Sequence, residues 1–149
     1  TAVPTVHGEG LSWTAPANWE TKAPSAMRRG SYHIKGANNT SADLSITAFP
    51  GDVGGDLANI NRWRGQIQLD PLIASSLPSQ ITILGVAGLE LKYVDMANLD
   101  LEAPQRILGA IVSYEGNTWF FKLMGPDTLI NAEKPGFIAF LKTIKGHIH

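Results

Sequence analysis

The sequence predicts an α+β fold, in which helices pack on the faces of an antiparallel β-sheet. Short apolar segments alternate with clusters of turn residues, as the strands of such a sheet do. Apolar residues also recur at helical spacing in the middle of the chain and near its C-terminus. The 149 residues suit a single hydrophobic core, and no internal repeat is visible.

The bulk composition is that of a globular protein and excludes several classes. Hydrophobic residues make up 44% of the chain and charged residues 17%. The net charge of -1 supplies no field that would attract nucleic acid or an anionic membrane. The absence of cysteine excludes disulfides and thiolate metal sites. No apolar run reaches the roughly 18 residues that span a bilayer.

Three strands are expected in the first third of the chain, over residues 11–16, 26–34 and 42–49. Pro16 ends the first strand, and a loop rich in Gly, Asn and Ser separates the second from the third. The third strand alternates regularly, which places Leu44 and Ile46 on one face and Ser45 and Thr47 on the other.

A helix is expected over residues 56–68, after a turn that contains Pro50 and three glycines. Its apolar residues recur at spacings of three, three and four and form one stripe: Leu57, Ile60, Trp63 and Ile67. Gly55 or Asp56 is expected to cap its start, and Asp70-Pro71 to end it. A loop with room for one helical turn follows.

Two hairpins are expected next, the first over residues 81–86 and 89–96 and the second over residues 106–114 and 118–125. Glu115-Gly116-Asn117 is a turn of the type that hairpins favour. The strands of the second hairpin are the most apolar, so we place them at the centre of the sheet.

The C-terminal part is predicted to be helical in two pieces. Asp127 is a favourable N-cap for the first piece. Pro135 lacks an N–H and clashes with the preceding turn, so it either kinks the helix or opens a second one. Phe137, Phe140 and Ile144 give the second piece an apolar stripe that suits a sheet face.

These features together resemble a known superfamily. Trp13, Pro16 and Trp19 are similar to the opening of PsbP-like proteins, and the order of central helix, late hairpin and closing helix is also similar. The segments FPGDVGG, NINRWRGQ and WFFKLMGP resemble those of a group of uncharacterised exported bacterial proteins or lipoproteins. The resemblance covers almost the whole chain.

The resemblance implies an α/β/α sandwich, with a flexible leader over residues 1–10 and a single PsbP-like domain over residues 11–146. It implies a binding or assembly subunit, exported to the periplasm or anchored by a lipid, with a possible protein partner in the cell envelope. No partner-binding residue of the superfamily can be matched to this sequence, and fold transfers more reliably than function.

The glycine-rich turn over residues 51–56 lacks the residues of a phosphate-binding or calcium-binding loop. A phosphate loop needs a lysine and a hydroxyl residue after its last glycine, where this chain has Asp56 and Leu57. Asp52 and Asp56 lack the alternating oxygen ligands of a calcium loop. We interpret the glycines as allowing a sharp turn from strand to helix.

The polar residues of the central helix have two interpretations. Asn59, Arg62 and Gln66 share one helix face beside Trp63, and they are candidate ligand-binding residues for a carboxylate, phosphate or sugar. The alternative is that they hold the turn and a neighbouring segment through hydrogen bonds, with Trp63 as a core anchor. The sequence favours this structural network and leaves the ligand site open.

No catalytic constellation and no cofactor or metal site is expected. The four histidines, His7, His33, His147 and His149, lack the spacing of a zinc site. No Gly-x-Ser-x-Gly elbow is present. Asp95, Asp100 and Glu102 are expected in one polar loop, where they would be solvated or paired with Arg62 or Arg64.

Two functions follow from these observations. The first is a non-catalytic binding or assembly domain that acts on an envelope or protein partner. The alternative is a small-ligand binder or weak hydrolase, with a polar cleft between the Gly-rich turn and the Asn59–Gln66 helix.

Overall fold

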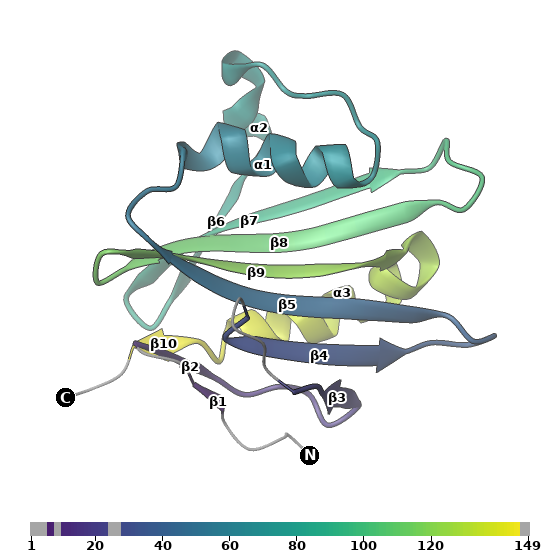
Figure 1. Ribbon diagram of the computed structural model, residues 1–149, viewed down its shortest axis with the longest axis horizontal. Coiled ribbons are helices and arrows are strands. Elements are labelled where there is room, and N and C mark those ends of the chain that lie inside the picture. The colour runs from purple at the N-terminus through teal and green to yellow at the C-terminus, as the bar shows by residue number, and fades with distance from the viewer. Residues whose placement is uncertain (1–5, 8–9, 24–27, 147–149) are drawn as a thin grey trace.

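The computed structural model describes residues 6, 7, 10–23 and 28–146, and it confirms the predicted α+β class. Its main element is a seven-stranded antiparallel sheet (Figure 1). In spatial order the strands are β3 (Trp19–Thr21), β4 (Gly30–Lys35), β5 (Ser41–Pro50), β9 (Asn117–Pro126), β8 (Gln105–Tyr114), β7 (Leu89–Asn98) and β6 (Thr82–Val86). The apolar hairpin of β8 and β9 lies in the middle of this order, as predicted.

A small second sheet joins the two ends of the described chain. In it β2 (Leu11–Trp13) pairs with β1 (Val6–His7) on one side and with β10 (Lys145–Gly146) on the other. The leader expected over residues 1–10 falls mostly outside the described residues, so its flexibility stays a prediction.

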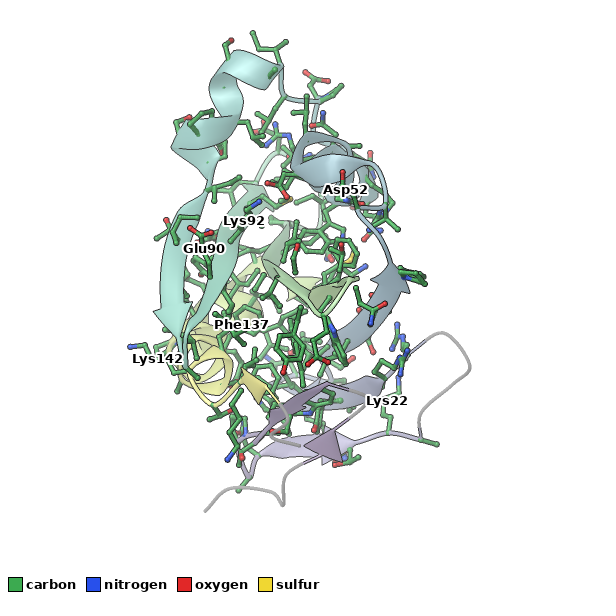
Figure 2. All side chains as sticks on the ribbon, turned by 90° about the vertical axis from the view of Figure 1, so that its left-hand side faces the viewer. Lys22, Asp52, Glu90, Lys92, Phe137 and Lys142 are labelled. Atoms are coloured by element: carbon green, nitrogen blue, oxygen red, sulfur yellow. The ribbon has the colours of Figure 1, made fainter. Side chains whose placement is uncertain are left out.

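Two helices cover opposite faces of the large sheet. The helical elements are α1 (Gly55–Gln66), the short η1 (Ala74–Ser76), α2 (Leu77–Gln80) and α3 (Asp127–Leu141). Figure 2 looks towards one end of the strands and shows α1 on one side of the sheet and α3 on the other. This arrangement is the predicted sandwich.

The face covered by α3 carries the larger core. Phe137 and Phe140 of α3 pack there against Phe121 of β9, and Phe137 lies between its helix and the sheet in Figure 2. Trp13 of β2 covers the rest of this face and donates a buried hydrogen bond of 3.0 Å from Nε1 to the Tyr32 hydroxyl. Helix and small sheet therefore close this face together.

The face covered by α1 has a smaller core. Its buried residues come from α1 and from strands β7, β8 and β9: Ile60, Trp63, Ile67, Val94, Met96, Ile107, Ile111 and Phe120. Trp63 lies directly on Gly109 of β8, where an added Cβ would sit 2.2 Å from the Trp63 Cζ3 atom. The glycine thus provides the space in which the indole packs.

The two hairpin turns form as their residues dictate. Glu115 and Gly116 between β8 and β9 have φ of 48° and 81°, and Ala87 and Gly88 between β6 and β7 have 51° and 80°. Positive φ at both central residues is the type I′ geometry that matches the twist of the strands.

Three expectations about local structure are wrong, and one strand was missed. The C-terminal helix is one continuous element through Pro135, whose ring lies on its exposed side, because Ile130 before it and Phe137 after it are buried in the same core. The N-cap of α1 is Gly54 in the left-handed region, instead of Gly55 or Asp56. The N-cap of α3 is Pro126, and Asp127 is the first residue of the helix instead of its cap. Residues 19–21 form an edge strand that was not predicted.

Candidate functional site

The polar residues of α1 divide into two groups, and one group holds the fold together. The Asn61 side chain donates to the Leu72 carbonyl at 3.1 Å and accepts from the Leu72 amide at 2.7 Å. Arg64 donates to the Asp70 carbonyl at 2.7 Å. Both side chains therefore fix the segment that follows the helix, as the structural interpretation proposed.

Asn59 belongs to both groups. Its Nδ2 donates to the carbonyls of Val53 at 3.3 Å and Gly55 at 2.7 Å, which closes the Gly-rich turn against the first helical turn. Its Oδ1 accepts from Arg62 Nη1 at 2.5 Å. Asn59 is 2% exposed, so it acts mainly as a buried support that orients the guanidinium of Arg62.

The second group faces a cavity of about 450 Å³ between α1 and the polar strip of strands β5 and β9. We call it the α1–β5 cavity. It is lined by Arg28, Ser45, Thr47, Phe49, Val53, Asn59, Arg62, Trp63, Gln66, Phe120 and Lys122. All four candidate residues, Asn59, Arg62, Trp63 and Gln66, are therefore brought together at one hollow.

The register of the sheet explains why polar residues line this hollow. Ser45 pairs with Lys122, and Thr47 pairs with Phe120, across strands β5 and β9. Phe120 packs in the core beneath α1, so its cross-strand and next-but-one neighbours point to the same face. Lys122, Ser45 and Thr47 therefore place hydroxyl and ammonium groups beside Phe120 on this face.

Arg62, Gln66 and Lys122 form the wall of the cavity. The guanidinium of Arg62 lies 5.5 Å from the centre of the Phe120 ring, which is cation–π geometry. Lys122 Nζ donates to Gln66 Oε1 at 2.7 Å. Two positive groups are thus held on the helix side and the strand side of one hollow.

A third positive group, Arg28, enters from the residues before β4 and is paired with a carboxylate. Its two Nη atoms contact the two Oδ atoms of Asp43 at 3.2 and 3.0 Å, and Lys22 also contacts Asp43 at 3.3 Å. Burial works to raise the pKa of Asp43, but the hydrogen bonds and charges of Arg28 and Lys22 outweigh it and hold the pKa below 3.8.

Lys122 has the environment of a crowded cation. Burial lowers the pKa of its ammonium from 10.5, and Asp43 opposes this effect, while Arg28 and Arg62 add to it by repulsion. Burial is therefore the main cause of the lowered pKa of Lys122, and repulsion from the two guanidinium groups adds to it.

The residues that line the cavity supply binding groups but no acid–base pair. None of the lining residues is an aspartate, glutamate or histidine. Within the described residues, no group of three or more histidine and acidic side chains is placed to hold a metal. The arrangement can neutralise and hydrogen-bond a negative ligand, and it offers an aromatic surface beside that charge.

Of the three acidic residues expected in one loop, Asp100 and Glu102 lie in the loop between β7 and β8 and are exposed, whereas Asp95 lies elsewhere. Asp95 lies within β7 and pairs with Arg106 and Lys134, each at 2.5 Å, so the expected pairing with Arg62 or Arg64 is wrong. Burial and the charge of Asp95 raise the pKa of the neighbouring Tyr93 to about 12. This network ties α3 to the sheet.

Sequence reasoning missed four polar residues of the cavity, Arg28, Ser45, Thr47 and Lys122, and three apolar ones, Phe49, Val53 and Phe120. The alternation of residues 42–49 already separated Ser45 and Thr47 from the apolar face. Lys122 stands out as the one basic residue next to Trp119, Phe120 and Phe121 in the sequence. Only the strand pairing shows that Ser45, Thr47 and Lys122 lie together on the face that α1 covers.

Comparisons with known proteins identify the fold. No protein-family model matches this chain, and no curated protein sequence resembles it closely enough to indicate a relative. Solved structures do match. CyanoP, the PsbP protein of the cyanobacterium Synechocystis sp. PCC 6803, has a TM-score of 0.57 at 12% identity and covers 93% of this chain and 87% of its own.

Two bacterial structures are also similar. LpqN, which is involved in cell envelope biogenesis of Mycobacterium tuberculosis, has a TM-score of 0.56 at 12% identity over 99% of this chain and 91% of its own. A Bacteroides thetaiotaomicron protein has a TM-score of 0.52 at 11% identity over 93% of this chain, which spans 46% of that protein's length. At these identities the similarity shows the fold alone, and this chain has a PsbP-like fold.

Proposed function

We propose that this chain is a non-catalytic binding domain of the cell envelope, whose ligand occupies the α1–β5 cavity. The observation that carries the proposal is the meeting of Arg62, Gln66 and Lys122 around one hollow of about 450 Å³. Cavities of this size and mixed polar and aromatic lining are typical of small-ligand sites.

The envelope assignment is supported by similarity. LpqN has the same fold over nearly its whole length and is involved in cell envelope biogenesis. The segments FPGDVGG and NINRWRGQ resemble those of exported bacterial proteins. None of the helices in the described residues has the length and apolar character that crossing a bilayer requires. The similarity to LpqN favours an exported domain, periplasmic or anchored by a lipid.

A binding role is better supported than hydrolysis. A hydroxyl nucleophile needs a base within hydrogen-bond reach. Ser45 has Lys122 as its cross-strand partner, but the ammonium of Lys122 donates to Gln66 and lies among two guanidinium groups. A cation in such a cluster serves charge recognition, because its neighbours also attract an anion.

Site-specific crosslinking in the native cells tests this proposal. A photoreactive phenylalanine analogue replaces Val53, which lines the cavity and is 40% exposed. The same analogue at Glu90, an exposed residue of β7, is the control. We expect a non-protein adduct at Val53 and none at Glu90. Adducts of equal yield at both positions, or none at Val53, would contradict the proposal.

A second candidate is protein docking, and a separate groove favours it. This groove of about 550 Å³ lies between residues 14–18 and α3, and apolar groups dominate its surface. The analogue at Ala139, which lines the groove, tests this role. A protein adduct at Ala139 without any adduct at Val53 would favour assembly over ligand binding.

A further inference from the structure

The charges around the α1–β5 cavity are unusual for this chain. The whole protein has a net charge of -1, yet Arg28, Arg62 and Lys122 converge on one hollow. The nearest paired carboxylate is Asp43, which contacts Arg28. Arg28, Arg62, Lys122 and Asp43 together carry a net charge of two positive units, and Lys22, which also contacts Asp43 but does not line the cavity, adds one more at its edge.

This excess matches a particular ligand charge. A phosphate monoester carries about -1.5 to -2 at neutral pH and presents three strong acceptor oxygens. Guanidinium groups bind such oxygens through paired hydrogen bonds, and an ammonium group adds a point charge. A single carboxylate would leave one of the two excess charges without a partner.

The rest of the lining suits the organic part of such a ligand. Phe49, Trp63 and Phe120 line one side of the hollow, and of these three rings Phe49 is the one that is only partly buried. Ser45 and Thr47 supply hydroxyl groups on the strand side. A cavity of about 450 Å³ has room for a phosphate together with a small ring.

We propose that the α1–β5 cavity binds a phosphate monoester, with Arg62 and Lys122 on its oxygens, Arg28 as the third cation, and the organic group against Phe49. The inference rests on the proposed function and specifies its ligand class. In this proposal Asp43 competes with the phosphate for Arg28, because its carboxylate accepts hydrogen bonds from the guanidinium of Arg28 when no ligand is bound.

Calorimetric titration with phenyl phosphate tests the proposal, with phenol and inorganic phosphate as the two halves of that probe. We expect phenyl phosphate to bind, inorganic phosphate to bind more weakly, and phenol to show no binding. Increasing salt should weaken the binding, because the contacts are ionic. Equal binding of phenol and phenyl phosphate would overturn the proposal.

Variants locate the site. Lys122→Met and Arg62→Gln should each weaken binding of phenyl phosphate by about 10- to 100-fold, the loss of one charge-assisted hydrogen bond. Lys142→Met removes the same charge from an exposed position beside α3 and should leave binding unchanged. Asp43→Asn should strengthen binding, because it releases Arg28.

Two outcomes from the variants would overturn the assignment. One is a Lys122→Met protein that unfolds like the parent and binds phenyl phosphate with the parent affinity. The other is an Asp43→Asn protein that binds less tightly. Circular dichroism of each variant shows whether its fold is retained, and Lys122→Arg, which keeps the charge, should restore most of the affinity.

Vesicles distinguish the source of the phosphate. Phosphatidic acid presents a monoester, phosphatidylglycerol a diester, and phosphatidylcholine no net charge. Binding to phosphatidic acid vesicles in addition to phenyl phosphate indicates a lipid headgroup, and binding to phenyl phosphate alone indicates a free phosphate ester. Binding to phosphatidylglycerol vesicles but not to either monoester overturns the proposal. A Val53 adduct without phosphate binding would leave the proposed function standing and this inference refuted.

Discussion

The two faces of the large sheet differ, and β9 at its centre shows how. Every second residue of this strand, Trp119, Phe121 and Leu123, faces α3 and is fully buried. The residues between them face α1, where Phe120 is buried but Lys122 lines a cavity. One strand therefore contributes to a closed core on one side and to an open site on the other.

The number of covering elements accounts for this difference. A helix is about 10 Å wide and strands lie about 4.8 Å apart, so one helix lying along a sheet covers two or three strands. On its face, α1 and the segment that follows it pack over β7, β8 and β9, and of β5 Phe49 joins this core. On the other face α3 is joined by β2, whose Trp13 covers the remaining strands. A binding site arises where the second cover is missing.

The largest loss of stability is expected for a substitution on the face covered by α3. Phe121→Ala should lower the free energy of unfolding by about 3–5 kcal/mol, because it leaves a cavity among Trp13, Trp119 and Phe140. Lys122→Ala, one residue along the same strand, should change it by less than about 1 kcal/mol. Urea denaturation of the two variants measures both values. Equal losses would show that the two faces do not differ in this way.

The contact between Trp63 and Gly109 gives the next largest effect. Gly109→Ala should cost about 1–3 kcal/mol, because the new Cβ would displace the indole and α1 with it. Gly65→Ala is the matched control. Gly65 lies in α1 with open space around its Cβ position, so this change should stabilise the protein by about 0.4–1 kcal/mol. A destabilised Gly65→Ala variant would contradict the packing described for α1.

A smaller loss of stability is expected when the contact between α1 and the segment after it is removed. Asn61→Ala removes both hydrogen bonds to the backbone of Leu72 and should cost about 1 kcal/mol. The loss should be local, so hydrogen exchange of the Leu72 amide should speed up while amides of β8 and β9 keep their protection. Uniform acceleration throughout the sheet would mean that Asn61 supports the whole fold.

The smallest effect concerns the pH dependence of stability on the open face. Burial lowers the pKa of Lys122 from 10.5, so its charged form is less favourable in the folded protein than in the unfolded one. Between the lowered pKa and 10.5 the unfolded chain binds more protons, so stability rises with pH in that window. The stability of the parent relative to Lys122→Met should therefore rise as pH approaches 10.5. If the difference in stability stayed constant or fell as pH rose, the ammonium of Lys122 would not have a lowered pKa in the folded protein.

Much of the fold was predictable because its signals are local. The turn at Glu115-Gly116 and the stripe of Ile60, Trp63 and Ile67 are properties of neighbouring residues, and both formed as predicted. The edge strand over residues 19–21 was missed because its pairing with β4 is a tertiary contact. Pro135 was expected to divide α3, but the buried residues on either side of it hold one helix together.

Only the helix side of the candidate site could be predicted from the sequence. The spacing of Asn59, Arg62 and Gln66 placed them on one helix face, and the structure brings all three to one hollow. Spacing did not distinguish Asn59, which bonds to the turn, from Arg62 and Gln66, which line the open side. Arg28 and Lys122 were beyond the reach of local patterns, because they lie far from α1 in sequence.

The sequence by itself determined the class of the fold, the order of the central helix, the two hairpins and the C-terminal helix, and the apolar stripe of α1, since hydrophobic periodicity and turn chemistry act between near neighbours. Only the tertiary structure decided that Arg28, Arg62 and Lys122 share one cavity, that Asp43 pairs with the first of them, and that α1 leaves part of its face uncovered. Strand register and helix position set these relations, and both depend on contacts between segments far apart along the chain.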